Sequence, residues 1–241
     1  MSVVYQPVLV YLSIAVAILG SLTALALTSG GSRQDAESWQ LSFALANGGL
    51  IMGSTIWSMH FIAMMAVEFP TVVNYSLVET IGSVCIAIVA TGIGLYLAST
   101  RRLGMLSIPV GGLLMGLGIA GMHYLGMGAI RGCGLAYDMR LVAASVAIAI
   151  AASIAALWFA FYKRGFWMTL AGGVAGGLAI ASMHYTAMAA TYFVPLGVDV
   201  ELARPLFPQS LLAYMIATGI VVLSAGNLGI VALMAAQDRS A

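Results

Sequence analysis

The chain has 241 residues, of which 62% are hydrophobic and only 7% charged, and its formal net charge is +1. No soluble domain of this size can bury so much apolar surface, so the composition predicts a polytopic membrane protein in contact with lipid. The near-neutral charge gives no reason to expect nucleic acid or acidic substrates as partners, and two cysteines are too few for a disulfide framework.

Seven apolar segments are long enough to cross a bilayer as helices, which takes about 20 residues. In chain order they cover residues of about 7–28, 39–67, 78–99, 105–130, 141–162, 167–193 and 210–235. The first begins without a basic stretch or a cleavage site, so we expect a span there and not a signal peptide. We therefore predict an all-α fold, a single integral membrane domain over residues 1–241 with seven transmembrane helices.

The second, fourth and sixth segments carry the same motif, a Met-His pair with another Met four residues after the histidine. The copies contain all three histidines of the chain: Met59, His60 and Met64; Met122, His123 and Met127; Met183, His184 and Met188. The histidines are 63 and 61 residues apart. Such a fixed period predicts repeated units. We expect three helical hairpins, each a plain span followed by a motif span, at about 7–70, 71–132 and 133–195, and a seventh helix at about 210–235.

Each motif ends a stripe of residues that share one helical face. Counting back from the histidine, positions −4, −7 and −11 are isoleucine, glycine and glycine in all three copies. Residues four apart on a helix face the same way, so each copy presents an imidazole and a thioether together. The two glycines form a G-x-x-x-G spacing, at which apolar helices approach closely. We expect the three motif helices to pack stripe against stripe, so that their histidines and methionines converge.

The basic residues are distributed unequally between the two ends of the predicted bundle. One end receives Arg33, Arg101, Arg102, Lys163, Arg164 and Arg239, whereas the other receives Arg131, Arg140 and Arg204. The positive-inside rule places the first end and the C-terminus in the cytoplasm and the N-terminus outside. Each histidine would then lie about seven residues, or about 10 Å, below the outer end of its helix.

A histidine inside a membrane has a structural interpretation as well as a functional one. It can simply bond a neighbouring helix, and methionine is a common filler of apolar cores. Three copies at one depth, each with methionine on the same face, favour a function. Imidazole with thioether suits copper, especially Cu(I), whereas zinc prefers thiolate or carboxylate partners. We predict one or two copper ions held by the motif histidines and methionines, with haem as the weaker alternative and a free copper position for a diatomic gas.

Two other classes of function fit a membrane copper site. Three His-Met pairs could pass copper across the membrane, although the cytoplasmic halves of the motif helices are glycine and aliphatic. A membrane oxidoreductase could use the metal for redox chemistry, although no path of carboxylates leads to the site. Cys133, Glu68 and Glu79 are lesser candidates near the outer end, as an extra soft ligand or as partners of the ligands.

The threefold motif resembles the MHYT family of bacterial integral membrane sensor domains. The third copy, Met183-His184-Tyr185-Thr186, matches the family's four letters; the second departs at Leu125 and the first at Phe61 and Ile62. The resemblance covers nearly the whole chain. It implies a non-enzymatic sensory input domain in the bacterial cytoplasmic membrane, one that binds copper and through it oxygen, carbon monoxide or nitric oxide. It also implies a cytoplasmic output partner, a cyclic-di-GMP enzyme or a histidine kinase. Because Phe61 lacks a hydroxyl, a role for the motif tyrosine can rest only on Tyr124 and Tyr185.

Overall fold

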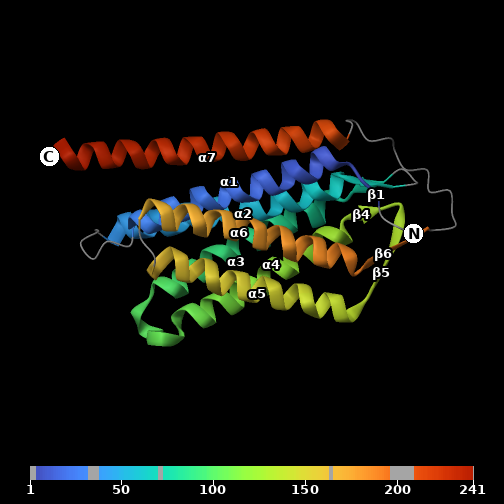
Figure 1. The fold of residues 1–241 in the computed structure, drawn as a ribbon, viewed down its shortest axis with the longest axis horizontal. Helices are drawn as coiled ribbons and strands as arrows, with labels where there is room; N and C mark the ends of the chain where they lie inside the picture. Colours follow the sequence, from blue (N-terminus) through green and yellow to red (C-terminus); the bar gives the residue numbers. More distant parts are fainter. Residues whose placement is uncertain (1–3, 32–37, 70–72, 163–164, 196–208, 241) are drawn as a thin grey trace.

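The computed structural model describes residues 4–31, 38–69, 73–162, 165–195 and 209–240. In these ranges it contains seven α-helices, all long and apolar enough to cross a membrane (Figure 1). Their bounds are α1 Pro7–Gly31, α2 Ser38–Met65, α3 Leu77–Ser99, α4 Ser107–Gly128, α5 Met139–Tyr162, α6 Phe166–Ala189 and α7 Gln209–Ser240. A 3₁₀ helix, η1 (Arg101–Leu106), joins α3 to α4. The predicted all-α polytopic fold is confirmed; most of the connection expected before the seventh helix lies outside the described residues.

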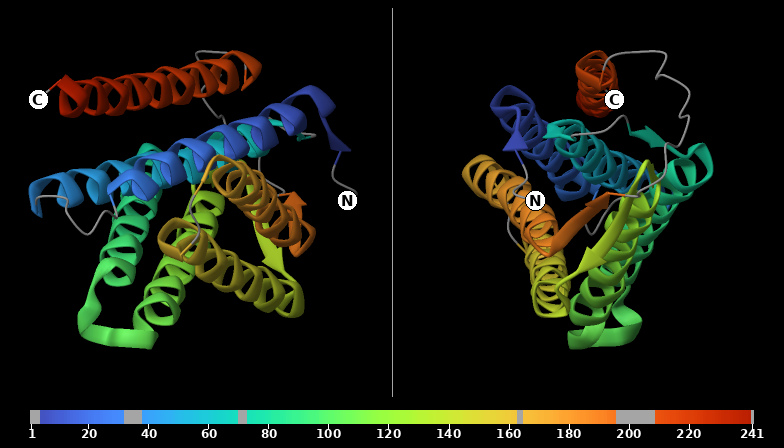
Figure 2. Two further views of the ribbon diagram at one scale, coloured as in Figure 1. Left: turned by 60° about the vertical axis from the view of Figure 1, so that its left-hand side comes forward. Right: turned by 90° about the vertical axis from the view of Figure 1, so that its right-hand side faces the viewer.

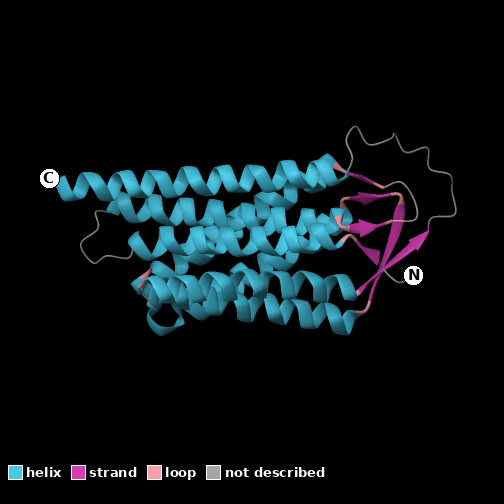
Figure 3. Cartoon of the chain, turned by 45° about the horizontal axis from the view of Figure 1, so that its top comes forward, coloured by secondary structure: helices cyan, strands magenta, loops and turns pink. Residues whose placement is uncertain are grey.

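Six short strands form a structure that the apolar pattern did not predict. They pair antiparallel as β1 (Val4–Tyr5) with β2 (Val67–Glu68), β3 (Asn74–Tyr75) with β4 (Ile130–Arg131), and β5 (Cys133–Tyr137) with β6 (Thr191–Pro195). Each pair joins the segment before one helix to the segment after the next helix, and all three pairs lie at the same end of the bundle as the N-terminus (Figure 3). The helices α2, α4 and α6 therefore end two to four residues earlier than expected.

The first six helices form a closed ring. Each packs against the next in sequence, and α6 returns to pack against α1, so that the motif helices α2, α4 and α6 alternate with the plain helices α1, α3 and α5 (Figure 2). The seventh helix lies outside the ring against α1 and α2. Large apolar side chains such as Val89, Leu117 and Val222 are exposed on the outer faces, as expected where lipid surrounds helices whose backbone bonds are satisfied internally.

The glycine stripes do not pack against one another, so that expectation was wrong. Each G-x-x-x-G instead contacts a plain helix, because an added Cβ at its second glycine would lie 2.5 Å from a Cα atom of that helix. The contacts are Gly53 with Ile88, Gly116 with Ile150, and Gly177 with Ile18. The motif helices are thus held at these glycines by the plain helices between them, while the longer histidine side chains of the same stripes reach the axis of the ring.

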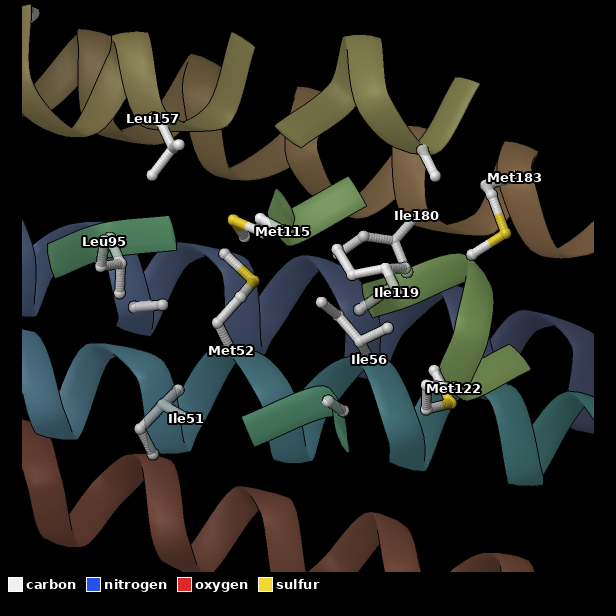
Figure 4. Packing of buried hydrophobic residues seen from close by; sticks show 14 of the residues in the cluster. Ile51, Met52, Ile56, Leu95, Met115, Ile119, Met122, Leu157, Ile180 and Met183 are labelled. Carbon is white, nitrogen blue, oxygen red and sulfur yellow. The ribbon is translucent and has the colours of Figure 1, made fainter. Parts of the chain in front are cut away.

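The largest apolar cluster fills the axis of the ring on the side of the histidines that faces away from the strands; this side is called below. Figure 4 shows Ile56, Ile119 and Ile180 gathered on the axis, with Met52 and Met115 beside one another farther from the strands. A second cluster joins α7 to α1 and α2, in which Ile62 packs with Ala213 and Ala217. These two clusters make α2 the most deeply buried of the seven helices.

Candidate metal centre

The three histidines meet on the axis of the ring, at the end that carries the strands. His60 of α2, His123 of α4 and His184 of α6 are all exposed by 1% or less. Each lies five residues before the last residue of its helix, which corresponds to about 7–8 Å instead of the expected 10 Å. The convergence predicted from the repeat is therefore observed, and the centre lies nearer the helix ends than expected.

The imidazole rings form a nearly equilateral triangle. The centroid of His60 lies 4.8 Å from that of His123 and 5.2 Å from that of His184, and the other two rings are also 5.2 Å apart. The rings stand at 73–78° to one another. One nitrogen can be chosen from each ring such that all three lie within 4.8 Å of one another. Symmetry of this kind follows from three copies of one motif on three equivalent helices.

The hydrogen-bonding capacity of the triangle is mostly unused. His60 and His184 share a hydrogen bond between their Nδ1 atoms at 3.2 Å. The remaining four ring nitrogens have no hydrogen-bond partner: His60 Nε2, His123 Nδ1, His123 Nε2 and His184 Nε2. Burying a polar atom without a partner costs about 1–3 kcal/mol. A group that binds to several of these nitrogens would remove that penalty.

A transition metal fits this donor set. A triangle with 4.8 Å edges has its centre about 2.8 Å from each corner, close to the roughly 2.0–2.1 Å of a metal–imidazole bond. Rotation of the side chains would close the difference. The site is dry and has imidazole as its ligand, which suits zinc, copper, iron and nickel. The histidines can therefore form a metal site, and the geometry alone leaves the identity of the metal open.

The six motif methionines flank the histidines in two layers. Met59, Met122 and Met183 lie in the axial cluster with the isoleucines, on the side away from the strands. Met64, Met127 and Met188 form a separate cluster with residues of the strands and their connections. All six are exposed by 2% or less. Thioethers are thus available both above and below the imidazoles.

Small residues three positions after each histidine leave room for the neighbouring imidazole. The clearest case is Gly126 of α4, where an added Cβ would lie only 2.4 Å from the unpartnered Nε2 of His60. Ala63 and Ala187 occupy the equivalent positions and are fully buried. The motif glycine therefore controls how closely α4 approaches a candidate ligand atom on α2.

In two of the three copies, the tyrosine after the histidine attaches its motif helix to the next plain helix of the ring. The Tyr124 hydroxyl and the Ser145 hydroxyl of α5 share a hydrogen bond at 2.8 Å, and those of Tyr185 and Ser13 of α1 share one at 3.0 Å. Phe61 of the first copy cannot make this bond. These serines were not among the candidates predicted from the sequence, since a serine in an apolar span carries no motif. Each lies six residues after the first residue of its helix, which was the available signal.

The departures of the first copy from the motif accompany deeper burial of its side chains. Tyr124 and Tyr185 are half-buried, whereas Phe61 is only 2% exposed. Ile62, which replaces the motif threonine, packs into the cluster between α1, α2 and α7. The first copy thus faces a protein neighbour where the other copies are partly exposed, and it carries apolar side chains in place of hydroxyls.

The lesser candidates lie at the strand end of the bundle, beyond the histidine triangle and not in it. Glu79 pairs with Arg131 and accepts a hydrogen bond from Ser76, which makes it part of the surface at the strand end of the bundle. Cys133 and Tyr75 pack against the cluster that contains Met64, Met127 and Met188. The buried hydroxyl of Tyr75 has no hydrogen-bond partner. Burial raises the pKa of the Cys133 thiol and that of Tyr75. The thiol therefore stays protonated at neutral pH in the absence of a metal.

The sequence matches a known family model three times. The model describes the MHYT repeat, a bacterial signalling protein N-terminal repeat, and it matches residues 53–111, 116–173 and 177–237. Each match begins at or next to a motif-helix glycine that contacts a plain helix. The first two matches run into the plain helix that this glycine contacts, whereas the third runs into α7 although Gly177 packs against α1.

The chain is also similar to parts of larger signalling proteins. It is 41% identical over 202 residues to the bifunctional diguanylate cyclase/cyclic di-GMP phosphodiesterase MucR of Pseudomonas aeruginosa, covering 80% of this chain and 29% of that protein. It is 38% identical over 208 residues to the cyclic di-GMP phosphodiesterase NbdA of the same organism, covering 82% and 26%. The signaling protein YkoW of Bacillus subtilis is 33% identical over 201 residues, covering 79% and 24%.

The chain thus spans about a quarter of the length of these relatives, and no solved structure matches it. The repeat match covers most of the sequence, and the histidines that it contains are the ones that meet on the axis. The chain therefore belongs to the MHYT family and is a membrane-spanning signalling domain.

Proposed function

We propose that this domain is a sensory input that binds copper at His60, His123 and His184 and responds to copper or to a diatomic gas. The observation that carries the proposal is the set of four buried ring nitrogens without partners. Such atoms destabilise a fold unless a ligand uses them. Three independent helices present them to one point, so the arrangement is poised for a shared metal.

Copper is preferred over zinc because of the methionine layers. Three imidazoles by themselves would also suit zinc. Thioethers are soft ligands that select Cu(I), and all six motif methionines lie buried above or below the triangle. The group of candidate ligands that the described residues form contains neither carboxylate nor thiolate. When bound, Cu(I) would supply a soft acceptor with a position for oxygen, carbon monoxide or nitric oxide.

The protein's own residues hold this site in place. The histidines supply the nitrogen ligands, and Gly126 leaves space beside His60 Nε2. The hydrogen bonds of Tyr124 and Tyr185 fix two motif helices to plain helices. A change in ligation at the triangle would therefore alter three helices together, and through α2 it would reach α7.

Charge and the relatives support a proposed orientation and output. The six-to-three distribution of basic residues supports a strand end outside the bacterial cytoplasmic membrane and a C-terminus in the cytoplasm. Two of the relatives are named as enzymes that make or cleave cyclic di-GMP. We therefore propose that the partner of this domain is a cytoplasmic cyclic-di-GMP enzyme, with a histidine kinase as the alternative, and that lipid surrounds the domain.

The test is the metal content of purified protein. Samples would be loaded anaerobically with Cu(I) or with Zn(II), passed through a desalting column, and analysed for metal per protein. We expect stoichiometric copper that a Cu(I) chelator removes, and no copper in a variant with all three histidines replaced by alanine. Stoichiometric zinc or haem with no retained copper would contradict the proposal. Met105→Leu is the control, because Met105 is 95% exposed and lies in η1, at the end of the bundle opposite the histidines.

Copper transport remains a second candidate because of two further thioethers. Met52 and Met115 lie beside one another on the axis, on the far side of the isoleucines from the histidines. They extend the soft ligands toward the other end of the bundle, where the sequence pattern suggested only glycine and aliphatic residues. Copper uptake into proteoliposomes that depends on Met52 and Met115 would favour transport over sensing.

A further inference from the structure

A small cavity lies on the axis of the ring, below the histidine triangle. Its volume is about 30 Å³, against roughly 10–15 Å³ needed to hold one water molecule. Ile56, Ile119 and Ile180 line it on the side toward the histidines, and Met52 and Met115 line it farther along the axis. The cavity therefore has room for one small molecule, and its wall toward the triangle contains the three isoleucines and Met183.

The cavity exists because one motif helix departs from the repeat. Eight residues before the histidine, α2 carries Met52 and α4 carries Met115, but α6 carries Gly176. All three residues line the cavity. Two side chains of a threefold layer are thus present and the third is missing. Gly176 therefore leaves this layer without the side chain that the other two motif helices supply.

The cavity opens between α5 and α6. The wall formed by the isoleucines and methionines is buried, whereas the four small residues Ala152, Ala156, Gly176 and Ala179 are only half-buried. They belong to α5 and α6, so the exposed side of the cavity is the groove between these two helices. The outer faces of the helices are apolar at this level. A molecule entering here would come from the hydrocarbon of the bilayer and not from water.

One unused polar atom points to the occupant. The hydroxyl of Ser153 lines the cavity, is 2% exposed and has no hydrogen-bond partner. A buried water needs two to four polar partners, and the remaining lining side chains are apolar. A diatomic molecule needs none and can still accept one hydrogen bond. The cavity therefore suits a small, weakly polar gas better than water.

We infer that this cavity binds a diatomic gas and gives it access to the centre from the lipid, through the opening between α5 and α6. The access role rests on the proposed function, because it needs a gas-binding metal at the triangle. Occupancy of the cavity does not rest on the proposed function, because a gas can fill the apolar space without a metal. We therefore expect a large side chain at residue 176 to prevent gas from occupying the cavity.

Xenon is the probe, because it binds in apolar cavities of proteins and needs no metal. Crystals of metal-free protein would be pressurised with xenon and its anomalous scattering measured. We expect a peak bordered by Met52, Ile119 and Ile180. Gly176→Met should remove it, because the backbone accepts a side chain there: an added Cβ would lie 3.5 Å from Ser21. Ala152→Leu, on the opposite helix, should remove it as well.

The control is Gly121→Met on α4. Gly121 faces outward and an added Cβ would meet nothing within 4 Å, so the variant makes the same chemical change away from the cavity. It should keep the xenon peak. No peak in the unaltered protein, an ordered water or lipid in its place, or a peak that survives Gly176→Met in a folded protein would overturn the inference.

A kinetic measurement tests access separately. In copper-loaded protein, recombination of carbon monoxide after photolysis should slow severalfold in Gly176→Met and stay unchanged in Gly121→Met. An unchanged rate in Gly176→Met would refute access. Failure of copper loading alone, with the xenon result intact, would refute the proposed function and leave the gas cavity standing.

Discussion

Trp57 donates its indole N–H to the hydroxyl of Ser83 at 3.1 Å, across the contact between α2 and α3. In the other two repeats the same contact is made by the motif tyrosine, from Tyr124 to Ser145 and from Tyr185 to Ser13. The tyrosines stand one residue after their histidines, whereas Trp57 stands three residues before His60. The two positions are four residues apart, which is about one helical turn, so they lie on the same face. The first repeat therefore keeps the interhelical bond although it lacks the motif hydroxyl.

This bond should be measurable as a coupling energy. Trp57→Phe leaves Ser83 without its donor and should lower the free energy of unfolding by about 0.5–1.5 kcal/mol. Ser83→Ala should do the same, and the double variant should lose little more than either single one. Thermal unfolding in detergent reports the effect. Trp167→Phe is the control, because Trp167 is 74% exposed. Strictly additive losses would show that the two side chains do not act together.

Replacement of one histidine should remove most of the copper. Because His60, His123 and His184 face one point, a site with two remaining imidazoles is incomplete, and the second replacement should add little to the loss. Copper per protein, measured for the three single His→Ala variants and the three doubles, decides between models. Three independent sites would instead lose about one third of the metal with each substitution. Melting temperatures measured alongside separate lost ligands from lost folding.

The outer methionines should matter for affinity and hardly at all for folding. Met64, Met127 and Met188 share a helical face with the histidines, and leucine keeps their volume while removing the sulfur. Each Met→Leu change should leave the melting temperature within a few degrees, since volume-conserving swaps cost less than about 1.5 kcal/mol. Cu(I) affinity, titrated against a competing chelator, should fall by about tenfold or more, or about 1.4 kcal/mol. Unaltered affinity in all three variants would remove these sulfurs from the site.

The glycine contacts should tolerate no side chain. An added Cβ at Gly53 would lie 2.5–2.7 Å from backbone atoms of α3, and backbone cannot move aside cheaply. Gly53→Ala should therefore destabilise the protein by roughly 1–3 kcal/mol and lower its metal content as well. Gly92→Ala, in α3 itself, is the control: its Cβ would meet nothing within 4 Å, and we expect a gain of up to about 1 kcal/mol from helix propensity. Equal melting temperatures for the two variants would contradict this packing.

The membrane orientation can be tested with single cysteines. In a background with Cys85 and Cys133 replaced by alanine, Ala136→Cys in β5 and Leu103→Cys in η1 lie at opposite ends of the bundle. An impermeant thiol reagent added to intact cells should label residue 136 and spare residue 103. The reverse result would place the histidine centre near the cytoplasm, and with it the proposal of an outward-facing sensor would fail.

The convergence of the histidines was predictable because repetition carries three-dimensional information. Three equal motifs at equal depth on helices that run in the same direction must occupy equivalent places in a bundle. The seven helices were also predictable, since lipid demands long apolar segments. The units expected at about 7–70, 71–132 and 133–195 remain a prediction.

The partner of each glycine stripe could not be derived in the same way. Helical periodicity shows which residues share a face, but it does not show which helix that face meets, and Gly53 meets Ile88 and not another glycine stripe. Strands of two residues, such as Val67–Glu68, are too short to leave an alternating pattern. The switch from Tyr to Trp57 as the donor to Ser83 is visible only when the helices are seen side by side.

The contact between α6 and α1 has a consequence for biosynthesis. Ile18 is made early, and its partner Gly177 follows about 160 residues later, so the ring cannot close while the chain is still emerging from the ribosome with five helices. Until then the flank of α1 that will receive α6 must rest against lipid or against the insertion machinery. His184 arrives with the same helix that closes the ring. Assembly of the histidine triangle and closure of the barrel-like bundle are therefore one late event, and any metal must be acquired after membrane insertion is nearly complete.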